Sequence, residues 1–322
     1  MKRFITKILI STLALWILCP SVNAATQLTP GGQVIGLALQ DDTLTVASID
    51  ATVGRSAQQA GIQVGDRLVK VNGCAVESIQ QVRSALEHSQ SAATVEILRN
   101  GKTKTLQLTP EQTQDGPRLG LYLKEGVTGI GTVTYYDPET GAFGALGHGV
   151  NTPTGDLVAM EEGTVFPAKV LSVKKGAVGK PGLLMGALED PQPVGALVKN
   201  TPQGVFGTIT ANANTPAVSV ATREQVHTGD AVIRSTIDDN SVQEYSVEIL
   251  KIYPGSNPSG RNMLLKVTDQ RLLDTTGGIV QGMSGSPIIQ DGKLVGAVTH
   301  VLVNDPTTGY GIFIENMLDA AA

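Results

Sequence analysis

The stretch of residues 275–289 reads TTGGIVQGMSGSPII, and it sets the expected class of structure for the second half of the chain. Ser284 follows Gly282-Met283 and precedes Gly285, a composition that suits a tight turn, and an apolar run typical of a β-strand comes next. Glycines allow the backbone N–H groups of Gly282 and Ser284 to turn toward one point, where an oxyanion would be held. The same residues also suit a plain turn between two strands, so other parts of the chain have to distinguish the two interpretations.

Short apolar segments separated by Gly, Pro and Asn turns continue through the region from Leu119 to the end of the chain. No amphipathic helix of normal length interrupts them before the terminus. This pattern predicts a mainly β domain over 118–322, built as a barrel or a sandwich. The segments are 129–135, 142–146, 164–173, 204–209, 231–235, 247–253 and 263–267.

Length and composition favour two domains and exclude several classes of partner. The chain has 322 residues, of which 41% are hydrophobic and 16% charged, and its net charge is −5. At roughly 150 residues a domain, two domains are expected. An acidic chain without a basic stripe argues against nucleic acid as a partner. The two cysteines, Cys19 and Cys74, form neither a disulfide framework nor a metal framework, so we expect no metal and no cofactor.

The first 24 residues form a targeting segment. Lys2, Arg3 and Lys7 precede the apolar run 8–18, and the small-residue pattern at 22–24 suits cleavage after Ala24. The apolar run is shorter than the roughly 20 residues of a stable membrane span. We therefore expect export, with residues 1–24 acting as a signal peptide or as a membrane anchor. Removal of this segment leaves 21 basic and 29 acidic residues, a net charge of −8.

A second pattern lies in the N-terminal half, where residues 60–73 read AGIQVGDRLVKVNG. It predicts a short helix that ends at Gly61, a strand, and a hairpin turn at Asn72-Gly73. Ile79, Val82 and Leu86 then recur at helical spacing and predict a helix with one buried face. The polar segment 110–117 suits a linker, which places the first domain at 27–112.

The residue pattern 60–73 resembles that of PDZ domains, especially those attached to bacterial proteases. The resemblance implies capture of peptide termini by β-augmentation, in which a free carboxylate meets backbone N–H groups. It also implies that Val34-Ile35-Gly36-Leu37 forms the carboxylate loop and that Ile79, Val82 and Leu86 form the opposite wall. A PDZ fold that packs only against its own chain is the alternative.

A serine nucleophile requires a base and an orienting acid, and the β domain offers one good candidate for each. His148 lies in FGALGHGV (143–150), where small neighbours allow another segment to approach closely, although a core or turn histidine fits as well. His300 reads as a wall of the substrate pocket or as core. Asp269 ends an apolar strand 15 residues before Ser284, whereas the other aspartates of this domain suit solvated turns.

Long motifs in the β domain resemble the SpoIVB peptidase family, the sporulation serine proteases of endospore-forming bacteria. The motifs are 144–148, 266–269, 277–287, 296–301 and 303–306, and the order of export segment, PDZ domain and peptidase is also that of the family. The resemblance implies a PDZ domain followed by a trypsin-like β-barrel peptidase. It makes Ser284 the nucleophile, His148 the general base and Asp269 the orienting acid.

The same resemblance implies a biological role. Members of the family are exported into the space between mother cell and forespore, with or without a membrane anchor. There they cleave their own chain and then a membrane-bound regulator of an intramembrane metalloprotease, which leads to sigma-K activation. Two alternatives are a PDZ scaffold with a non-catalytic trypsin-like domain and a general envelope quality-control protease.

One residue departs from ordinary trypsin-like enzymes. Met283 precedes the nucleophile, whereas those enzymes have a buried Asp there that pairs with a new N-terminus and shapes the oxyanion hole. Met283 cannot form such an ion pair. We therefore hypothesise that any activation by self-cleavage acts differently, for example by release of the PDZ domain.

Overall fold

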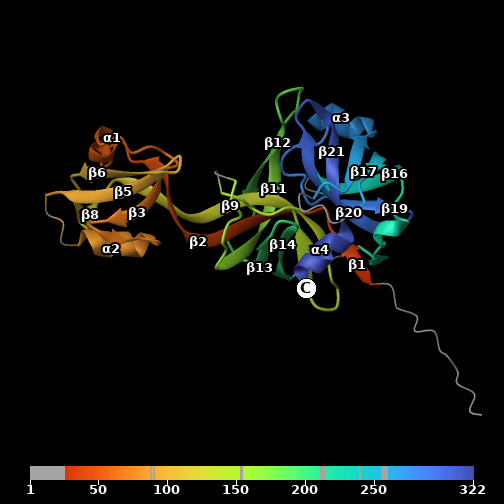
Figure 1. Ribbon diagram of the computed structural model, residues 1–322, viewed down its shortest axis with the longest axis horizontal. Coiled ribbons are helices and arrows are strands. Elements are labelled where there is room, and N and C mark those ends of the chain that lie inside the picture. The colour runs from red at the N-terminus through yellow and green to blue at the C-terminus, as the bar shows by residue number, and fades with distance from the viewer. Residues whose placement is uncertain are drawn as a thin grey trace, which may run out of the picture.

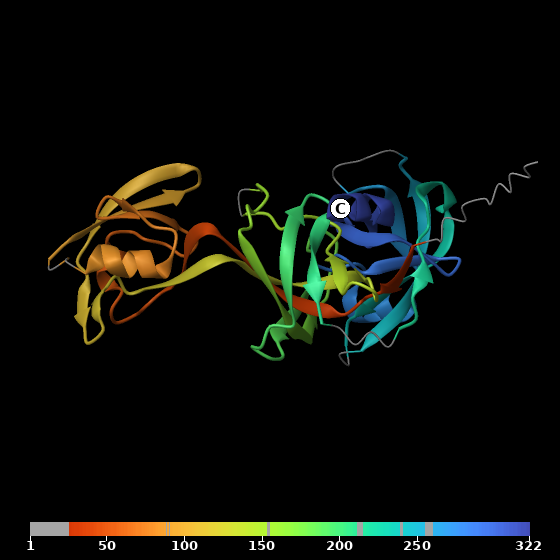
Figure 2. The same cartoon turned by 90° about the horizontal axis from the view of Figure 1, so that it is seen from below.

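The computed structural model describes residues 26–87, 89, 91–152, 155–210, 215–238, 241–254 and 260–322, apart from the side chains of residues 41 and 42. The predicted targeting segment 1–24 and His88 lie outside the described residues. The described chain forms a small lobe and a large lobe, connected by a two-stranded ribbon (Figures 1 and 2). None of the described helices is long and apolar enough to cross a membrane.

The ribbon consists of β2 (Val34–Ile49) and β9 (Leu121–Tyr136), which run antiparallel from the pair Val34↔Thr132 to the pair Ile49↔Leu121. Each strand takes part in both lobes. The end of the ribbon near Ile49 lies in the small lobe, and the end near Val34 lies in the large lobe (Figure 1).

The small lobe encloses one apolar core, to which Leu44, Leu68, Val82, Ile97 and Leu119 all contribute. Its other elements are α1 (Arg55–Gln59), β3 (Arg67–Val71), β4 (Cys74–Ala75), α2 (Ile79–Leu86), β5 (Ala93–Arg99), β6 (Lys102–Leu108), β7 (Glu111–Thr113) and β8 (Gly116–Arg118).

The structure explains two residues of the pattern 60–73, Asn72 and Asp66. Asn72 adopts a φ of 51° in the predicted hairpin turn, and its side-chain oxygen accepts the amide of Thr94 at 3.0 Å. The buried carboxylate of Asp66 accepts the amide of Gln63 and both Nε and Nη2 of Arg99. Because a buried carboxylate is costly unless it is paired, this cluster explains the acidic residue in the pattern.

The large lobe contains two rings of strands side by side (Figure 1). In the first ring, pairing of β2 with β9 closes the order β9-β10-β14-β13-β11-β2, with β1 beside β9 and β12 beside β11. The second ring is a closed barrel in the order β16-β17-β18-β21-β20-β19. The first ring and its neighbours comprise β1 (Gln27–Pro30), β10 (Ala142–Ala145), β11 (Glu162–Lys174), β12 (Leu183–Leu188), β13 (Gly195–Thr201), β14 (Gly204–Ile209) and β15 (Val218–Ser219). The barrel and its helices comprise η1 (Arg223–Gln225), β16 (Gly229–Thr236), β17 (Val242–Ile252), β18 (Met263–Val267), α3 (Gln270–Thr276), β19 (Pro287–Gln290), β20 (Lys293–Leu302), β21 (Asp305–Phe313) and α4 (Ile314–Ala321).

The lobes do not divide at the predicted boundary of 27–112 and 118–322. Residues 34–39 pair with β9 on one side and residues 35–40 pair with β11 on the other, so this segment belongs to the first ring of the large lobe. Leu119, just after the predicted linker, is buried in the core of the small lobe. The small lobe is thus inserted between β2 and β9. The reason is that an apolar strand such as 34–39 fits equally well beside strands that are distant in sequence.

Candidate active site

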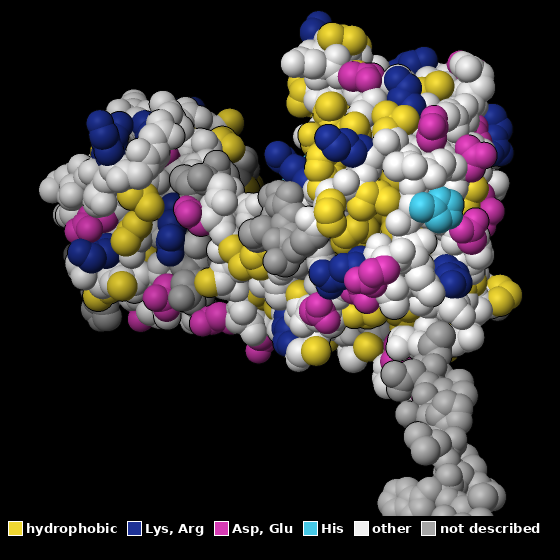
Figure 3. Space-filling model, turned by 45° about the vertical axis from the view of Figure 1, so that its right-hand side comes forward, with side chains coloured by type: hydrophobic (Ala, Val, Ile, Leu, Met, Phe, Trp, Pro, Cys, Tyr) yellow, Lys and Arg dark blue, Asp and Glu magenta, His cyan; other side chains and the backbone are white. Residues whose placement is uncertain are grey.

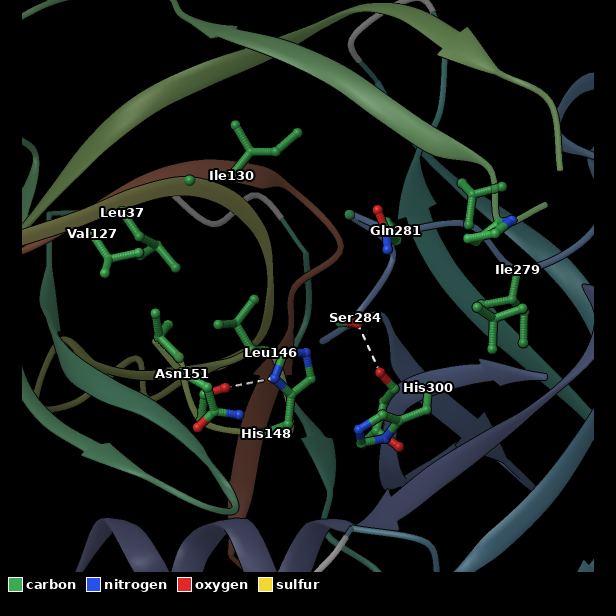
Figure 4. Close-up of a pocket in the computed structure, with 18 of the residues that line it drawn as sticks. Leu37, Val127, Ile130, Leu146, His148, Asn151, Ile279, Gln281, Ser284 and His300 are labelled. Carbon is green, nitrogen blue, oxygen red and sulfur yellow. Dashed lines mark hydrogen bonds between the residues drawn. The ribbon is translucent and has the colours of Figure 1, made fainter. Parts of the chain in front are cut away.

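Ser284 lies in the loop between α3 and β19, at the junction of the two rings. Its hydroxyl donates a hydrogen bond to the carbonyl oxygen of Thr299 on β20 at 2.8 Å. The structure shows no hydrogen bond between Ser284 and His148 within its described residues. Figure 4 shows Ser284 close to the rings of His148 and His300.

The nucleophile turn is fastened to β9 of the first ring. Thr132 donates from Oγ1 to the carbonyl of Gly282 at 2.7 Å and from its amide to the carbonyl of Ser284 at 3.2 Å. Thr134 donates from Oγ1 to the carbonyl of Gly285 at 2.8 Å. The sequence reasoning missed these two residues. The sequence pattern that could have indicated them is a pair of threonines two residues apart in an apolar strand, because this spacing places both side chains on the same buried face.

Two amides of the turn are available to bind an oxyanion. The amide of Met283 donates to the carbonyl of Val280, but the amides of Gly282 and Ser284 donate to no acceptor in the described part of the chain. Gly282 has a φ of 99°, a conformation that side-chain-bearing residues rarely adopt. The two predicted oxyanion-binding residues thus have free donors on the same turn.

His148 follows β10 and comes from the first ring. Its Nδ1 donates to the carbonyl of Gly149 at 2.8 Å, and because a carbonyl can only accept, the proton is on Nδ1 and Nε2 carries a lone pair. Burial lowers the pKa of His148 below its ordinary value of 6.5, while the bond to Gly149 opposes this shift. Asn200 fixes the following segment through bonds to both the amide and the carbonyl of Val150.

His148 and Ser284 line one pocket of about 570 Å³ between the rings. Leu37, Leu39, Val127 and Ile130 line it from the first ring, and Figure 4 shows several of these side chains on one side of the serine. The second ring contributes Ile279, Val280, Gln281, Val301 and Val303. The pocket therefore has mainly apolar walls around two groups suited to acyl transfer.

His300 on β20 lines the same pocket, in agreement with the first of its two sequence interpretations. Its ring centroid lies 5.4 Å from that of His148, and its buried Nδ1 has no hydrogen-bond partner among the residues that the structure describes. Burial, followed by the charges of His148 and Arg261, lowers the pKa of His300 to about 4. The ring is consequently neutral near pH 7.

Asp269 is not brought to His148. Its carboxylate caps the N-terminus of α3 by accepting the amides of Arg271 and Leu272, and it also accepts the amide of Ser246 at 3.3 Å. An ion pair of 2.8 Å with Arg271 completes its environment, and hydrogen bonding to Arg271 is the main cause that lowers the pKa of Asp269. The predicted orienting acid therefore acts as a helix cap here, and the carbonyl of Gly149 occupies Nδ1 of His148.

A second pocket, of about 160 Å³, lies in the small lobe between α2 and the start of β9. The predicted wall residues Ile79, Val82 and Leu86 line it. Along residues 121–125, β9 pairs with β2 in the described structure, and its other edge faces this pocket. An extended peptide would add to that edge.

The structure contradicts the predicted position of the carboxylate loop at residues 34–37. Val34, Ile35, Gly36 and Leu37 lie in the large lobe and pair with β9, and residues 35–37 pair with β11 as well, so this segment is not part of the groove in the small lobe. Leu119, Gly120 and Leu121 line the groove instead, and Gly120 has a φ of 68°. The sequence carries the apolar-Gly-apolar pattern at both 35–37 and 119–121, and only the fold distinguishes them.

Comparisons with known proteins agree with both lobes. The SpoIVB peptidase S55 family matches residues 115–318, and the PDZ domain family matches residues 53–99. A Staphylococcus aureus protein named as a zinc metalloprotease is 37% identical over 81 residues, which are 25% of this chain and 19% of that protein. A Vibrio cholerae protein of the same name is 33% identical over 129 residues, 40% of this chain and 27% of its own. The chain thus matches about a fifth to a quarter of the length of these relatives.

Solved structures give partial matches. The Rv3671c protease from M. tuberculosis in its active form is 16% identical, with a TM-score of 0.36, over 74% of this chain and 81% of that chain. The HtrA-type protease AlgW with a decapeptide is 12% identical, with a TM-score of 0.37, over 74% and 66%. The PDZ domain of an SdrC-like protein from Listeria monocytogenes is 19% identical, with a TM-score of 0.23, over 26% and 87%.

The predicted fold class, a mainly β chain with a PDZ domain and a trypsin-like β-barrel peptidase, is confirmed. A PDZ domain supports peptide binding, and the family supports serine peptidase activity. Because the family match covers more than half of the chain, this protein belongs to the SpoIVB peptidase S55 family and carries a PDZ domain.

Proposed function

We propose that this protein is a serine endopeptidase in which Ser284 is the nucleophile and His148 the general base. The observation that carries the proposal is the meeting of both residues in one pocket, next to the free amides of Gly282 and Ser284. The two residues come from different rings, so the pocket exists only when both rings are folded and in contact.

The reaction follows from the donors and acceptors in the pocket. Oγ of Ser284 forms a bond to the carbonyl carbon of the substrate, and its proton passes to Nε2 of His148, which has the free lone pair. The amides of Gly282 and Ser284 hold the oxyanion. Collapse of the intermediate breaks the C–N bond, and the leaving amine takes the proton from His148. Water then repeats these steps on the acyl-enzyme.

Substrate binding would free the nucleophile. The hydroxyl of Ser284 donates to the carbonyl of Thr299 at 2.8 Å, so its proton is directed at that carbonyl and not at His148. A backbone amide of an extended substrate on β20 would compete for that carbonyl and release the hydroxyl. The apolar walls formed by Ile279, Val280 and Val301 suit an apolar side chain beside the scissile bond.

The test of this assignment uses purified protein and a fluorophosphonate probe. Labelling and self-cleavage should be lost in Ser284→Ala, with a loss of kcat on the order of 10⁶-fold, as for nucleophile removal in comparable enzymes. Labelling should persist in Ser286→Ala, which serves as a neighbouring-serine control. Because burial lowers the pKa of His148, kcat/KM should stay high until the pH falls below the ordinary histidine value of 6.5. Self-cleavage by the Ser284→Ala protein would contradict the proposal.

We further propose the SpoIVB-type role for the chain. Family membership supports self-cleavage followed by cleavage of a membrane-bound regulator of an intramembrane metalloprotease, with sigma-K activation as the outcome. The basic and apolar pattern of residues 1–18 supports export to the space between mother cell and forespore, either released or anchored at its N-terminus. Mass spectrometry of the mature N-terminus distinguishes these two forms.

The role has its own test. In a sporulating strain that lacks its own peptidase of this family, the wild-type chain should restore sigma-K-dependent transcription, and Ser284→Ala should not. Restoration by the Ser284→Ala chain would contradict a proteolytic role, and failure of an enzymatically active wild-type chain would contradict the signalling role alone.

A further inference from the structure

The oxyanion-binding turn of this chain is held without the ion pair that ordinary trypsin-like enzymes use. Met283, the residue before the nucleophile, is fully buried in the apolar core of the second ring. Another contact must therefore fix the peptide between Gln281 and Gly282, because the amide of Gly282 has to point into the pocket for an oxyanion to bind.

The β11–β12 hairpin provides such a contact. The amide of Gln281 donates to the carbonyl of Gly182 at 3.0 Å, and the amide of Leu184 donates to the carbonyl of Gln281 at 2.8 Å. These two bonds form a short parallel bridge between β12 and the turn. Because the amide of Leu184 points at the turn, it takes no part in the pairing of β12 with β11.

The bridge decides which way the next amide points. In a trans peptide the carbonyl and the following N–H point in opposite directions. With the carbonyl of Gln281 held on Leu184, the N–H of Gly282 points away from β12, and Gly282 lines the pocket beside Ser284. A flip of this peptide would place a carbonyl oxygen where the oxyanion has to sit, and it would break the bond to Leu184.

Close packing supports the same bridge. Leu184 is almost fully buried and shares an apolar core with Val280 and Met283. A Cβ atom on Gly182 would lie 2.5 Å from Cγ1 of Val280, so only glycine allows this approach. The hairpin also binds the start of the loop that carries Ser284, because the amide of Gly176 donates to the carbonyl of Thr276 at 2.8 Å.

We propose that the β11–β12 hairpin braces the oxyanion-binding turn, and that Leu184 and Gly182 are positioning residues for the amide of Gly282. The brace lies within one chain and takes the place of the ion pair that Met283 cannot form. It projects from the large lobe (Figure 1), and Leu171, Met185 and Leu188 of the hairpin are exposed apolar residues. Figure 3 shows hydrophobic side chains on the surface of the large lobe. This inference rests on the proposed peptidase function.

Three variants of the full chain test the brace. Leu184→Pro removes the N–H that holds Gln281, and proline is tolerated where a strand's N–H does not serve its own sheet. Leu184→Ala keeps that N–H and removes side-chain packing alone. Met185→Ala is the matched control, because its side chain is on the opposite face of the same strand and is 44% exposed.

We expect kcat of Leu184→Pro to fall by about 10²–10³-fold, the effect of losing one oxyanion donor, with KM little changed. A peptide aldehyde, which forms an oxyanion-like adduct with Ser284, should lose affinity in proportion, whereas the cleaved product peptide should bind as before. Leu184→Ala should lose less activity than Leu184→Pro, and Met185→Ala should match the wild type. The midpoint of the pH profile should not move, because His148 is untouched.

A folded Leu184→Pro protein that retains kcat and aldehyde affinity would overturn the brace. If Leu184→Pro does not fold, Gly182→Ala gives the same test, because its Cβ would press on Val280, and normal kcat and aldehyde affinity in that variant would likewise overturn the proposal. Failure of the peptidase proposal itself looks different, because then the wild-type chain would neither label at Ser284 nor cleave peptides.

Discussion

The carboxylate of Asp269 is surrounded by donors from three residues, Ser246, Arg271 and Leu272. These bonds fix the start of α3, the helix that leads into the nucleophile loop. The capping of α3 is therefore sufficient to explain why an aspartate lies 15 residues before Ser284. A charged cap with an arginine partner is also sufficient to hold the pKa of the carboxyl below its ordinary value.

This geometry makes a prediction that separates a helix cap from an orienting acid. Asn caps helices about as well as Asp, so Asp269→Asn should keep most of the activity, whereas Asp269→Ala should lose about 1 kcal/mol of stability and some activity. An orienting acid would instead lose about 10⁴-fold in kcat on change to Asn. Thermal melting and kcat of both variants decide the matter. A loss of that size in Asp269→Asn, with an unchanged Tm, would contradict the cap role.

At the residue scale, the sequence predicts which side chains line the site but not the hydrogen bonds that hold them in place. The small neighbours of His148 and Ser284 indicate sites of close approach, and both residues line one pocket. Thr132, Thr134 and Leu184 were missed because their contribution depends on which strand lies beside the turn. Backbone pairing of this kind leaves little trace in the sequence, because any residue except proline can donate an amide.

At the scale of elements, the groove between α2 and β9 is the site where peptide termini should bind. Arg83 and Arg118 line it together with the apolar residues of α2, so the groove offers cationic residues for a terminal carboxylate and an apolar wall for the last side chain. The start of β9 supplies a strand edge for the backbone.

We predict that a labelled peptide with a free apolar C-terminus binds there and that its amidated form binds more weakly. Ile79→Glu should weaken binding at least about tenfold, or ~1.4 kcal/mol, because it places a carboxylate in the groove. Gln80→Glu is the control, since it adds the same charge on the exposed face of the same helix. Fluorescence anisotropy measures both. Equal affinities for the two variants would place the peptide elsewhere.

At the scale of the whole molecule, the chain enters the PDZ lobe through β2 and leaves it through β9. A single cut near residues 110–117 therefore leaves the two lobes joined through β2, and release of the PDZ lobe needs a second cut. A fragment that starts at Leu119 would also lack residues 34–39, and the first ring would lose a strand that pairs on both sides.

Removal of the PDZ lobe in the middle of the ribbon should preserve the peptidase. Leu39 and Val127 face each other across the ribbon, so an Asn-Gly turn in place of residues 41–125 would close a hairpin at this point. We expect this deletion variant to fold cooperatively and to label at Ser284, and a fragment starting at Leu119 to be unfolded. Circular dichroism, thermal melting and probe labelling compare the two. A folded, labelled fragment from Leu119 would contradict this assignment of β2.

The sequence by itself determined the fold class, the family, the nucleophile turn and the helical wall of the groove. Those features are local, because turn glycines, strand alternation and helical spacing act over a few residues. Only the tertiary structure decided that residues 34–39 belong to the peptidase, that 119–121 serve the groove, and that Asp269 caps α3. It also decided that β9 and β12 hold the turn around Ser284. Each of these depends on which distant strand supplies the partner, and an apolar strand carries the same pattern whichever neighbour it has.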